Sequence, residues 1–272
     1  YSRGEEPLVR PGFLRNKQLS GGLVMFFFQY LAQAGLFFVV PLYLSVCLGL
    51  SALATGARLL PLSVTLLIAA IGIPRFLPNI SPRLVVRVGL FSLLVGTVVL
   101  LTALDADSGP EIVFVPMLLV GLGIGALASQ LGAVTVSAVP DEDAPEVGGV
   151  QNTMTNLGAS LGTALAGSVM IAAVASSFLA NILANPSISP DVKSKAQVEL
   201  AAGVPFVSDA DLEQALDQAG ADQATSDAAL EAYKDARLDG LKTALAILAG
   251  AIIGALFLAG SIPKRQPGSN EP

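Results

Sequence analysis

Long apolar stretches alternate with short polar ones along this chain, and the apolar stretches determine the predicted fold. The hydrocarbon core of a bilayer is about 30 Å thick, so a helix needs about 20 apolar residues to cross it. Backbone groups in lipid must pair within their own segment, which favours helices. Six segments reach the required length and predict an all-α membrane protein with six transmembrane helices, at residues 21–48, 52–73, 84–104, 112–139, 147–179 and 241–262.

Positive charge predicts the direction of these spans. Lys and Arg lie before the first span, between the second and third, and after the sixth: Arg3, Arg10, Arg15, Lys17, Arg75, Arg83, Arg87, Lys264 and Arg265. With six spans these positions fall on one side, and the positive-inside rule makes that side cytoplasmic. We therefore expect a multi-pass protein of the cell membrane with both termini in the cytoplasm. The expected parts are a cytoplasmic linker (1–19), helices one to five (20–179), an extracytoplasmic loop (180–239), helix six (240–263) and a cytoplasmic tail (264–272).

The loop at 180–239 is the longest polar segment and is predicted to be partly helical. Ser208 and Asp211 fit a capping box, which predicts a short helix after Ser208. Thr225 or Ser226 is the predicted start of a second helix that continues into the sixth span. The loop is expected to form a soluble hairpin packed on the bundle, with a lid that captures a ligand as the alternative.

Composition supports a membrane protein and argues against most catalytic chemistry. Hydrophobic residues make up 53% of the chain and charged residues 13%, whereas soluble domains have about 25% charged residues. There is no histidine, which removes most acid–base, metal and triad chemistry. The formal net charge of −6 comes mainly from the late polar loop, so it does not indicate a nucleic-acid partner. We expect neither an enzyme nor a bound cofactor.

Pairs of glycines recur at the spacing that lets membrane helices approach closely. Small residues four positions apart lie on one helix face. The G-x-S-x-G pattern at 158–162 also matches a hydrolase elbow, but that elbow needs a preceding strand and a histidine. The G-x-G-x-G pattern at 121–125 resembles a dinucleotide loop without the βαβ context. The predicted helix-packing residues are therefore Gly121, Gly125, Gly158, Gly162, Gly250 and Gly254.

A few amide side chains lie within the predicted spans. Asn152 and Asn156 are four residues apart and share a helix face, and Gln29 and Gln33 have the same spacing. Amides in lipid must face protein or water. These four side chains, with Gln130 as a weaker candidate, either hold helices together by hydrogen bonds or line a substrate cavity.

Arg58 is the only charged residue between Lys17 and Arg75. Its guanidinium cannot lose its proton, and a charge at the centre of a membrane helix costs about 2.5–3.5 kcal/mol on insertion scales. The predicted topology places Arg58 about one turn below the outer surface, where its stem can snorkel toward water. We expect Arg58 to lock the start of the second span against neighbouring loops as an outer-gate residue. Direct contact with a substrate or a proton is the alternative.

The order of several short motifs resembles one known family. Segments PLYL (41–44), LGLS (48–51), GARLLP (56–61), GLGIG (121–125) and GVQNT (149–153) resemble the C-terminal half of a major facilitator superfamily transporter. More narrowly, they resemble the fourteen-span drug:proton antiporters among multidrug efflux pumps. The resemblance covers residues 13–264. Two features depart from the family pattern: Thr155 stands where the family usually has an arginine, and the loop after the second span lacks the acid of an Asp-Arg-x-Gly-like turn.

This resemblance implies two six-helix bundles with the substrate bound between them near the membrane midplane. The chain would supply one bundle, and its partners would be the lipid bilayer, the missing N-terminal half, a small lipophilic substrate and protons. The predicted function is the C-terminal bundle of a proton-coupled efflux transporter for lipophilic drug-like molecules, incomplete without its other half. The alternatives are a non-transporting membrane fragment or scaffold, and a major-facilitator carrier of another small solute.

Overall fold

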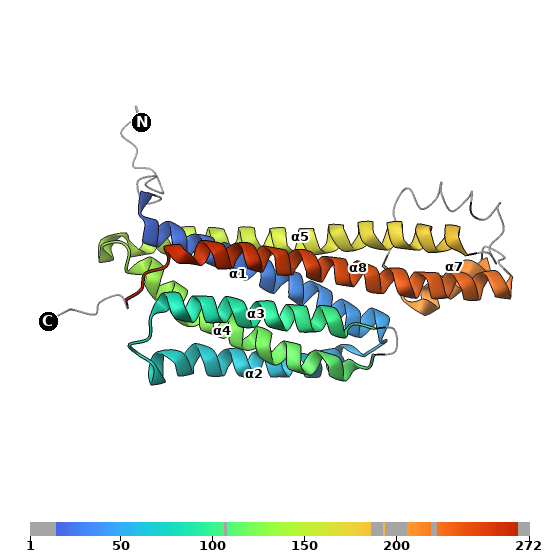
Figure 1. Cartoon of the computed structure of the whole chain (residues 1–272), viewed down its shortest axis with the longest axis horizontal. Coiled ribbons are helices and arrows are strands. Elements are labelled where there is room, and N and C mark those ends of the chain that lie inside the picture. The colour runs from blue at the N-terminus through green and yellow to red at the C-terminus, as the bar shows by residue number, and fades with distance from the viewer. Residues whose placement is uncertain (1–14, 106–107, 186–192, 194–205, 219–221, 266–272) are drawn as a thin grey trace, which may run out of the picture.

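The computed structural model describes residues 15–105, 108–185, 193, 206–218 and 222–265, which are almost entirely helical (Figure 1). Six helices are long and apolar enough to cross a membrane, which confirms the predicted number of spans and the all-α class. No β-strand occurs in these described ranges. The main helices are α1 (Lys17–Leu42), α2 (Ala52–Phe76), α3 (Pro82–Ala103), α4 (Phe114–Val136), α5 (Ala144–Ala184), α7 (Asp209–Gln218) and α8 (Gln223–Leu258). A short π-helix, η2 (Tyr43–Cys47), follows α1, and a short 3-10 helix, η3 (Pro110–Val113), precedes α4.

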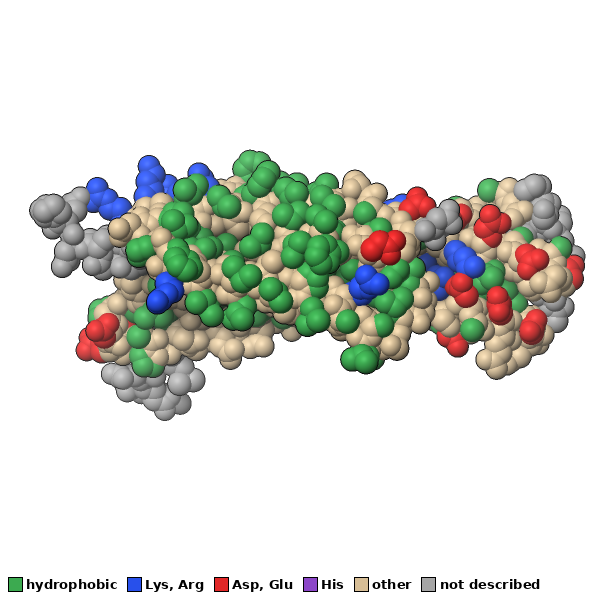
Figure 2. Space-filling view, turned by 90° about the horizontal axis from the view of Figure 1, so that it is seen from below, with side chains coloured by type: hydrophobic (Ala, Val, Ile, Leu, Met, Phe, Trp, Pro, Cys, Tyr) green, Lys and Arg blue, Asp and Glu red, His purple; other side chains and the backbone are tan. Residues whose placement is uncertain are grey.

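The six long helices lie side by side in one bundle. α1 begins and α8 ends at the same end, here called the terminal end, and α7 lies at the opposite end, here called the α7 end (Figure 1). α1 packs mainly on α5, α2 on α4, α3 on α4, and α5 on α8. Figure 2 shows apolar side chains over the middle of the bundle and charged side chains gathered toward its two ends. This distribution matches a helix bundle whose middle lies in hydrocarbon.

Polar side chains start several of these helices. Asn16 caps α1 by accepting a 2.9 Å hydrogen bond from the backbone N–H of Gln18. Ser208 and Asp211 form the predicted capping box, because the Ser208 hydroxyl donates to the Asp211 carboxylate at 2.6 Å and accepts from the Asp211 backbone N–H at 3.3 Å. Asp222 caps α8 by accepting from the Thr225 backbone N–H at 2.8 Å. The cap of the second predicted helix is therefore Asp222, three residues before Thr225, and the helix begins at Gln223.

α5 and α8 are much longer than a membrane requires. They have 41 and 36 residues, which correspond to about 60 and 54 Å at 1.5 Å per residue. Much of the partly helical loop predicted at 180–239 is helix, and the helix expected near Thr225 begins at Gln223 and continues without a break into the sixth span. Hydropathy ends a span where charges begin, but an alanine-rich backbone continues its helix past that point.

A buried arginine fixes the segment around α7 onto α8. Arg237 on α8 is only 2% exposed. Its Nη1 donates to the carbonyl of Val207 at 2.9 Å, its Nη2 pairs with Asp209, and its Cζ lies 5.1 Å from the centre of the Tyr233 ring. The Tyr233 hydroxyl accepts from the Val207 N–H at 2.9 Å, and Lys234 Nζ lies 3.1 Å from the Asp209 carboxylate. We call Val207, Asp209, Tyr233, Lys234 and Arg237 the α7 clamp.

Four of the predicted packing glycines lie at close helix crossings. A Cβ at Gly158 or Gly162 of α5 would overlap the backbone of α1 at Phe27 and Leu31. Gly121 and Gly125 place α4 in the same way against the backbone of α2 at Leu62 and Leu66. A Cβ at either of the other two predicted positions, Gly250 and Gly254, would meet nothing within 4 Å. The packing expected at those two glycines is absent from the described chain, because their side of α8 faces no neighbouring helix.

Candidate functional site

The six polar candidates from the sequence do not form one cluster. Those on α5 lie near the terminal end, whereas the arginine on α2 lies near the α7 end. The exposed side chains are Arg58, Asn152 and Asn156. Gln33 is half-buried, and the two buried side chains are Gln29 and Gln130.

The exposed face of α5 carries a row of polar side chains. Asn152, Asn156, Ser160 and Thr163 are all exposed, and their spacing of four, four and three residues places them on one face of the helix. Asn156 Nδ2 donates to the backbone carbonyl of Asn152 at 2.8 Å, so its carboxamide oxygen is available to other donors. We call these four residues the polar stripe. The sequence reasoning missed Ser160 and Thr163, although continuing the spacing from Asn152 would have found both.

The polar stripe borders an aromatic side chain of α1. The stripe continues in helical spacing to Gly167, where a Cβ would lie 3.6 Å from the ring of Phe38. On another side of α5, Gly158 and Gly162 hold that helix against α1. Gln33 of α1 is half-buried. The exposed surface therefore combines neutral hydrogen-bonding groups with an apolar ring.

Gln29 and Gln130 lie inside the bundle, which corrects the cavity-lining role considered for them. Gln29 is 3% exposed, and its Oε1 has no hydrogen-bond partner in the part of the chain that the structure describes. It lies two helical turns after Gly22, whose Cβ would meet Thr135 of α4, so Gln29 is on the side of α1 that faces α4. Gln130 is also 3% exposed, and its Nε2 donates to Ser129 Oγ at 3.3 Å.

Polar contacts join α1, α4 and α5 at the terminal end. Gln18 Nε2 of α1 donates to the carbonyl of Val134 at 2.7 Å. Gln151 of α5 donates to the hydroxyl of Thr135, which lies on α4. Leu19, Leu23 and Val147 form a separate buried apolar cluster at the same end. These contacts hold together the helices beside the polar stripe at that end.

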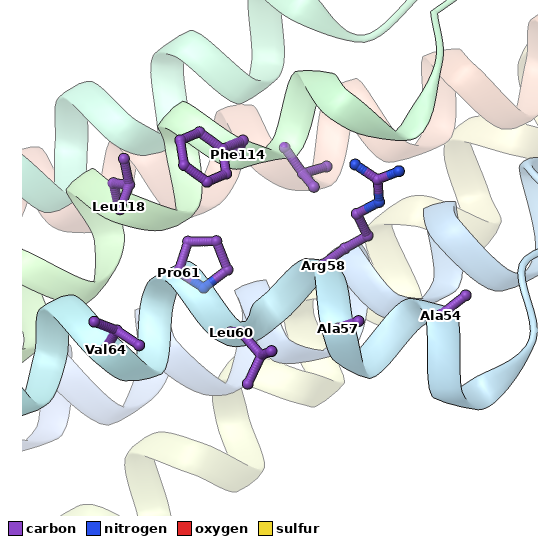
Figure 3. Close-up of a pocket in the computed structure, with 9 residues that line it drawn as sticks. Ala54, Ala57, Arg58, Leu60, Pro61, Val64, Phe114 and Leu118 are labelled. Atoms are coloured by element: carbon purple, nitrogen blue, oxygen red, sulfur yellow. The ribbon is translucent and has the colours of Figure 1, made fainter.

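Arg58 faces an open groove between α2 and the beginning of α4. The groove has a volume of about 720 Å³ and is lined by residues of α2, of α4 and of Val113 in η3, with none from α1 or α5. Figure 3 shows Arg58 and Pro61 on the side of α2 that faces Phe114. In the described chain the Arg58 guanidinium makes no hydrogen bond or ion pair. The lock expected against neighbouring loops is not seen among the described residues, because those that line the groove with Arg58 are apolar.

The fold and these surfaces agree with a comparison against known families. Residues 3–163 match the family model described as Major Facilitator Superfamily. The chain belongs to the major facilitator superfamily. Its matched part includes α1 to α4 and the first half of α5, with all four residues of the polar stripe and the Arg58 groove.

Several curated members of this superfamily are similar to the chain. It is 34% identical over 181 residues to a tetracenomycin C resistance and export protein of Streptomyces glaucescens, covering 65% of this chain and 33% of that protein. It is 28% identical over 194 residues to a puromycin resistance protein of Streptomyces alboniger, covering 70% and 38%. It is 24% identical over 171 residues to a multidrug efflux pump of Mycolicibacterium smegmatis, covering 63% and 34%. The chain thus spans about a third of the length of the curated relatives it matches.

Acidic side chains of this major facilitator bundle lie toward its ends. Helices α1 to α4 contain no Asp or Glu, α5 contains none after Glu146, and α8 contains none after Asp239. Among the described residues, no group of three or more His, Cys, Asp or Glu could hold a metal ion. The middle of the bundle therefore offers neutral hydrogen-bonding groups and apolar surface for recognition.

Proposed function

We propose that the chain is the C-terminal six-helix bundle of a proton-coupled exporter of lipophilic, drug-like molecules. The export and resistance names of its relatives support the class of substrate. The observation that carries the proposed site is the exposed polar stripe on α5. In this proposal the protein lies in the cell membrane with the basic terminal end in the cytoplasm.

The polar stripe needs water or a partner on the side that the described chain leaves open. Amide and hydroxyl groups on a membrane helix are costly when they face lipid, so they face the interior of a bundle or a watered cavity. A second six-helix bundle opposite α5 would make the stripe one wall of such a cavity. Neutral polar groups beside Phe38 suit a lipophilic molecule that has a few hydrogen-bonding atoms.

Proton coupling requires a group that gains and loses a proton within the membrane. Because the middle of this bundle has no carboxylate or histidine, we propose that the second bundle supplies the proton-binding acids. Transport would then proceed by rocking of the two bundles around the substrate. The partners of this bundle are the bilayer, the second bundle, the substrate and protons.

One observation favours a second candidate function, a membrane scaffold without transport. The turn between α2 and α3, at 77–81, contains no acidic residue. The related transporters are expected to have a charged gating turn at this place. A full-length protein that reaches the membrane and exports no tested lipophilic drug would support this second candidate.

We expect Asn156→Leu in the full-length transporter to lower drug export by about two- to tenfold, because a lost hydrogen bond to a substrate costs about 0.5–1.5 kcal/mol. Export is measured as the outward flux of a fluorescent lipophilic drug from energised cells, normalised to protein in the membrane. The control is Ser176→Leu, which changes an exposed polar residue of α5 outside the stripe. Unchanged export by Asn156→Leu, or an equal loss in both variants, would remove the stripe from the substrate site.

A further inference from the structure

The groove at Arg58 combines one unpaired cation with an apolar channel. Arg58 is exposed, and its guanidinium carries five N–H donors. None of these donors binds another group of the described chain. The other residues that line the groove are all apolar, from Ala54 and Ala57 to Leu118. A positive charge in such surroundings indicates a ligand that brings both a negative charge and apolar surface.

The charge and the apolar surface lie in a definite order along the membrane normal. Arg58 is seven residues after Ser51, the N-cap of α2, and therefore about 10 Å along the helix from its start at the α7 end. Pro61 and Val64 follow one and two turns deeper, and Leu118 of α4 faces them across the groove (Figure 3). The cation is thus near a membrane surface, and the apolar part extends toward the middle of the bundle.

We propose that this groove binds an anionic phospholipid from the surrounding membrane. The lipid phosphate lies against the Arg58 guanidinium, whose planar fork suits two parallel hydrogen bonds to phosphate oxygens. One acyl chain lies between α2 and α4 along Pro61, Val64 and Leu118. The volume of about 720 Å³ is in the range of small-molecule sites. No residue of the polar stripe lines the groove, so this lipid site is separate from the proposed substrate site and does not depend on transport.

The lipid pairs a charge that the described part of the chain leaves unpaired, and it takes the place of the expected lock to a loop. A free phosphate would satisfy the guanidinium but would leave the apolar channel empty. A zwitterionic lipid would fill the channel but would bring a positive group close to Arg58. An anionic phospholipid matches both parts of the groove, which gives a preference that can be measured.

The test measures lipid binding to the full protein purified in neutral detergent, using native mass spectrometry with phosphatidylglycerol or phosphatidylcholine. We expect phosphatidylglycerol to bind more tightly than phosphatidylcholine. Arg58→Gln should weaken phosphatidylglycerol binding by about tenfold, and Arg58→Lys should weaken it less, because lysine keeps the charge without the planar fork. Val64→Trp, which fills the channel and leaves the cation in place, should also weaken binding. Arg75→Gln is the matched control, because Arg75 is an exposed arginine at the other end of α2.

Several results would overturn the proposal. Equal binding of the two lipids, or wild-type binding by Arg58→Gln, would show that Arg58 does not select a lipid phosphate. Wild-type binding by Val64→Trp, with displacement of lipid by inorganic phosphate, would indicate a small-anion site instead. If Arg75→Gln weakened phosphatidylglycerol binding as much as Arg58→Gln, the lipid would be attracted to any exposed arginine of the protein and not to this groove. No selective binding by the wild-type protein would show that another part of the protein covers the groove.

Discussion

Gly162→Val is expected to prevent the normal assembly of α1 and α5. A Cβ at Gly162 would overlap the oxygen, the carbonyl carbon and the Cα of Leu31. These are backbone atoms of a membrane helix and cannot rotate away as a side-chain tip can. Overpacking costs about 1–3 kcal/mol or more even where side chains can adjust, and proteins have only about 5–15 kcal/mol of stability in total. We therefore expect loss of most of the folded protein.

The measurement is the yield of monodisperse protein by size-exclusion chromatography of a fluorescent fusion, together with its midpoint of thermal unfolding. Gly162→Val should lower the yield severalfold, and it should also lower the midpoint of thermal unfolding. Gly254→Val is the matched control, because the same change in a G-x-x-x-G pair of α8 meets open space. Equal behaviour of the two variants, or a wild-type midpoint for Gly162→Val, would show that the close crossing of α1 and α5 does not limit stability.

These two glycines show what a sequence pattern can and cannot predict. Gly162 and Gly254 each end a G-x-x-x-G pair in an apolar helix, so the local pattern is the same. Only the position of a neighbouring helix distinguishes them, and that position depends on residues far away in the chain. The six spans were predictable for the opposite reason, because the length and apolar character of a span are local properties.

The amide candidates show the same limit. Gln29 and Asn156 each belong to a pair spaced by four residues, yet Gln29 is buried against α4 and Asn156 is exposed. Spacing identifies the shared face of a helix, but it does not identify what that face meets. The position of Arg58 near one end of α2 could be predicted from the length of its span. Its apolar neighbours Val113 and Phe114 could not, because they come from another helix and the turn that precedes it.

The helix that leads into the sixth span was predictable only in part. The residues from Gln223 to Asp239 contain several charges, so hydropathy places them outside the span, although the capping signal near Thr225 predicts that they are helical. In the structure they form the first half of α8, with Tyr233 and Arg237 buried under the segment that leads into α7. A charged residue that is buried by a distant segment has no signature in a hydropathy pattern.

Arg237→Leu is expected to release α7 from α8. The change removes the hydrogen bond to Val207 and the ion pair with Asp209, and it leaves both acceptors without their buried donor. Breaking a buried pair by removing one partner costs about 3–5 kcal/mol, and partial exposure of Asp209 places the expected cost at the lower end, about 3 kcal/mol. An isolated helix as short as α7 is unstable in water. The local helix should therefore open while the six spans remain folded.

Hydrogen–deuterium exchange with mass spectrometry measures this opening directly. We expect amides in α7 to exchange about a hundredfold faster in Arg237→Leu, because each 1.4 kcal/mol is a tenfold change in an equilibrium. Amides in the apolar half of α8 should keep their protection. Lys234→Leu is the control, because its pair with Asp209 is largely exposed and such pairs contribute about 0–1 kcal/mol. If α7 keeps its protection in Arg237→Leu, the segment is held by its apolar contacts, and the buried arginine does not determine its position.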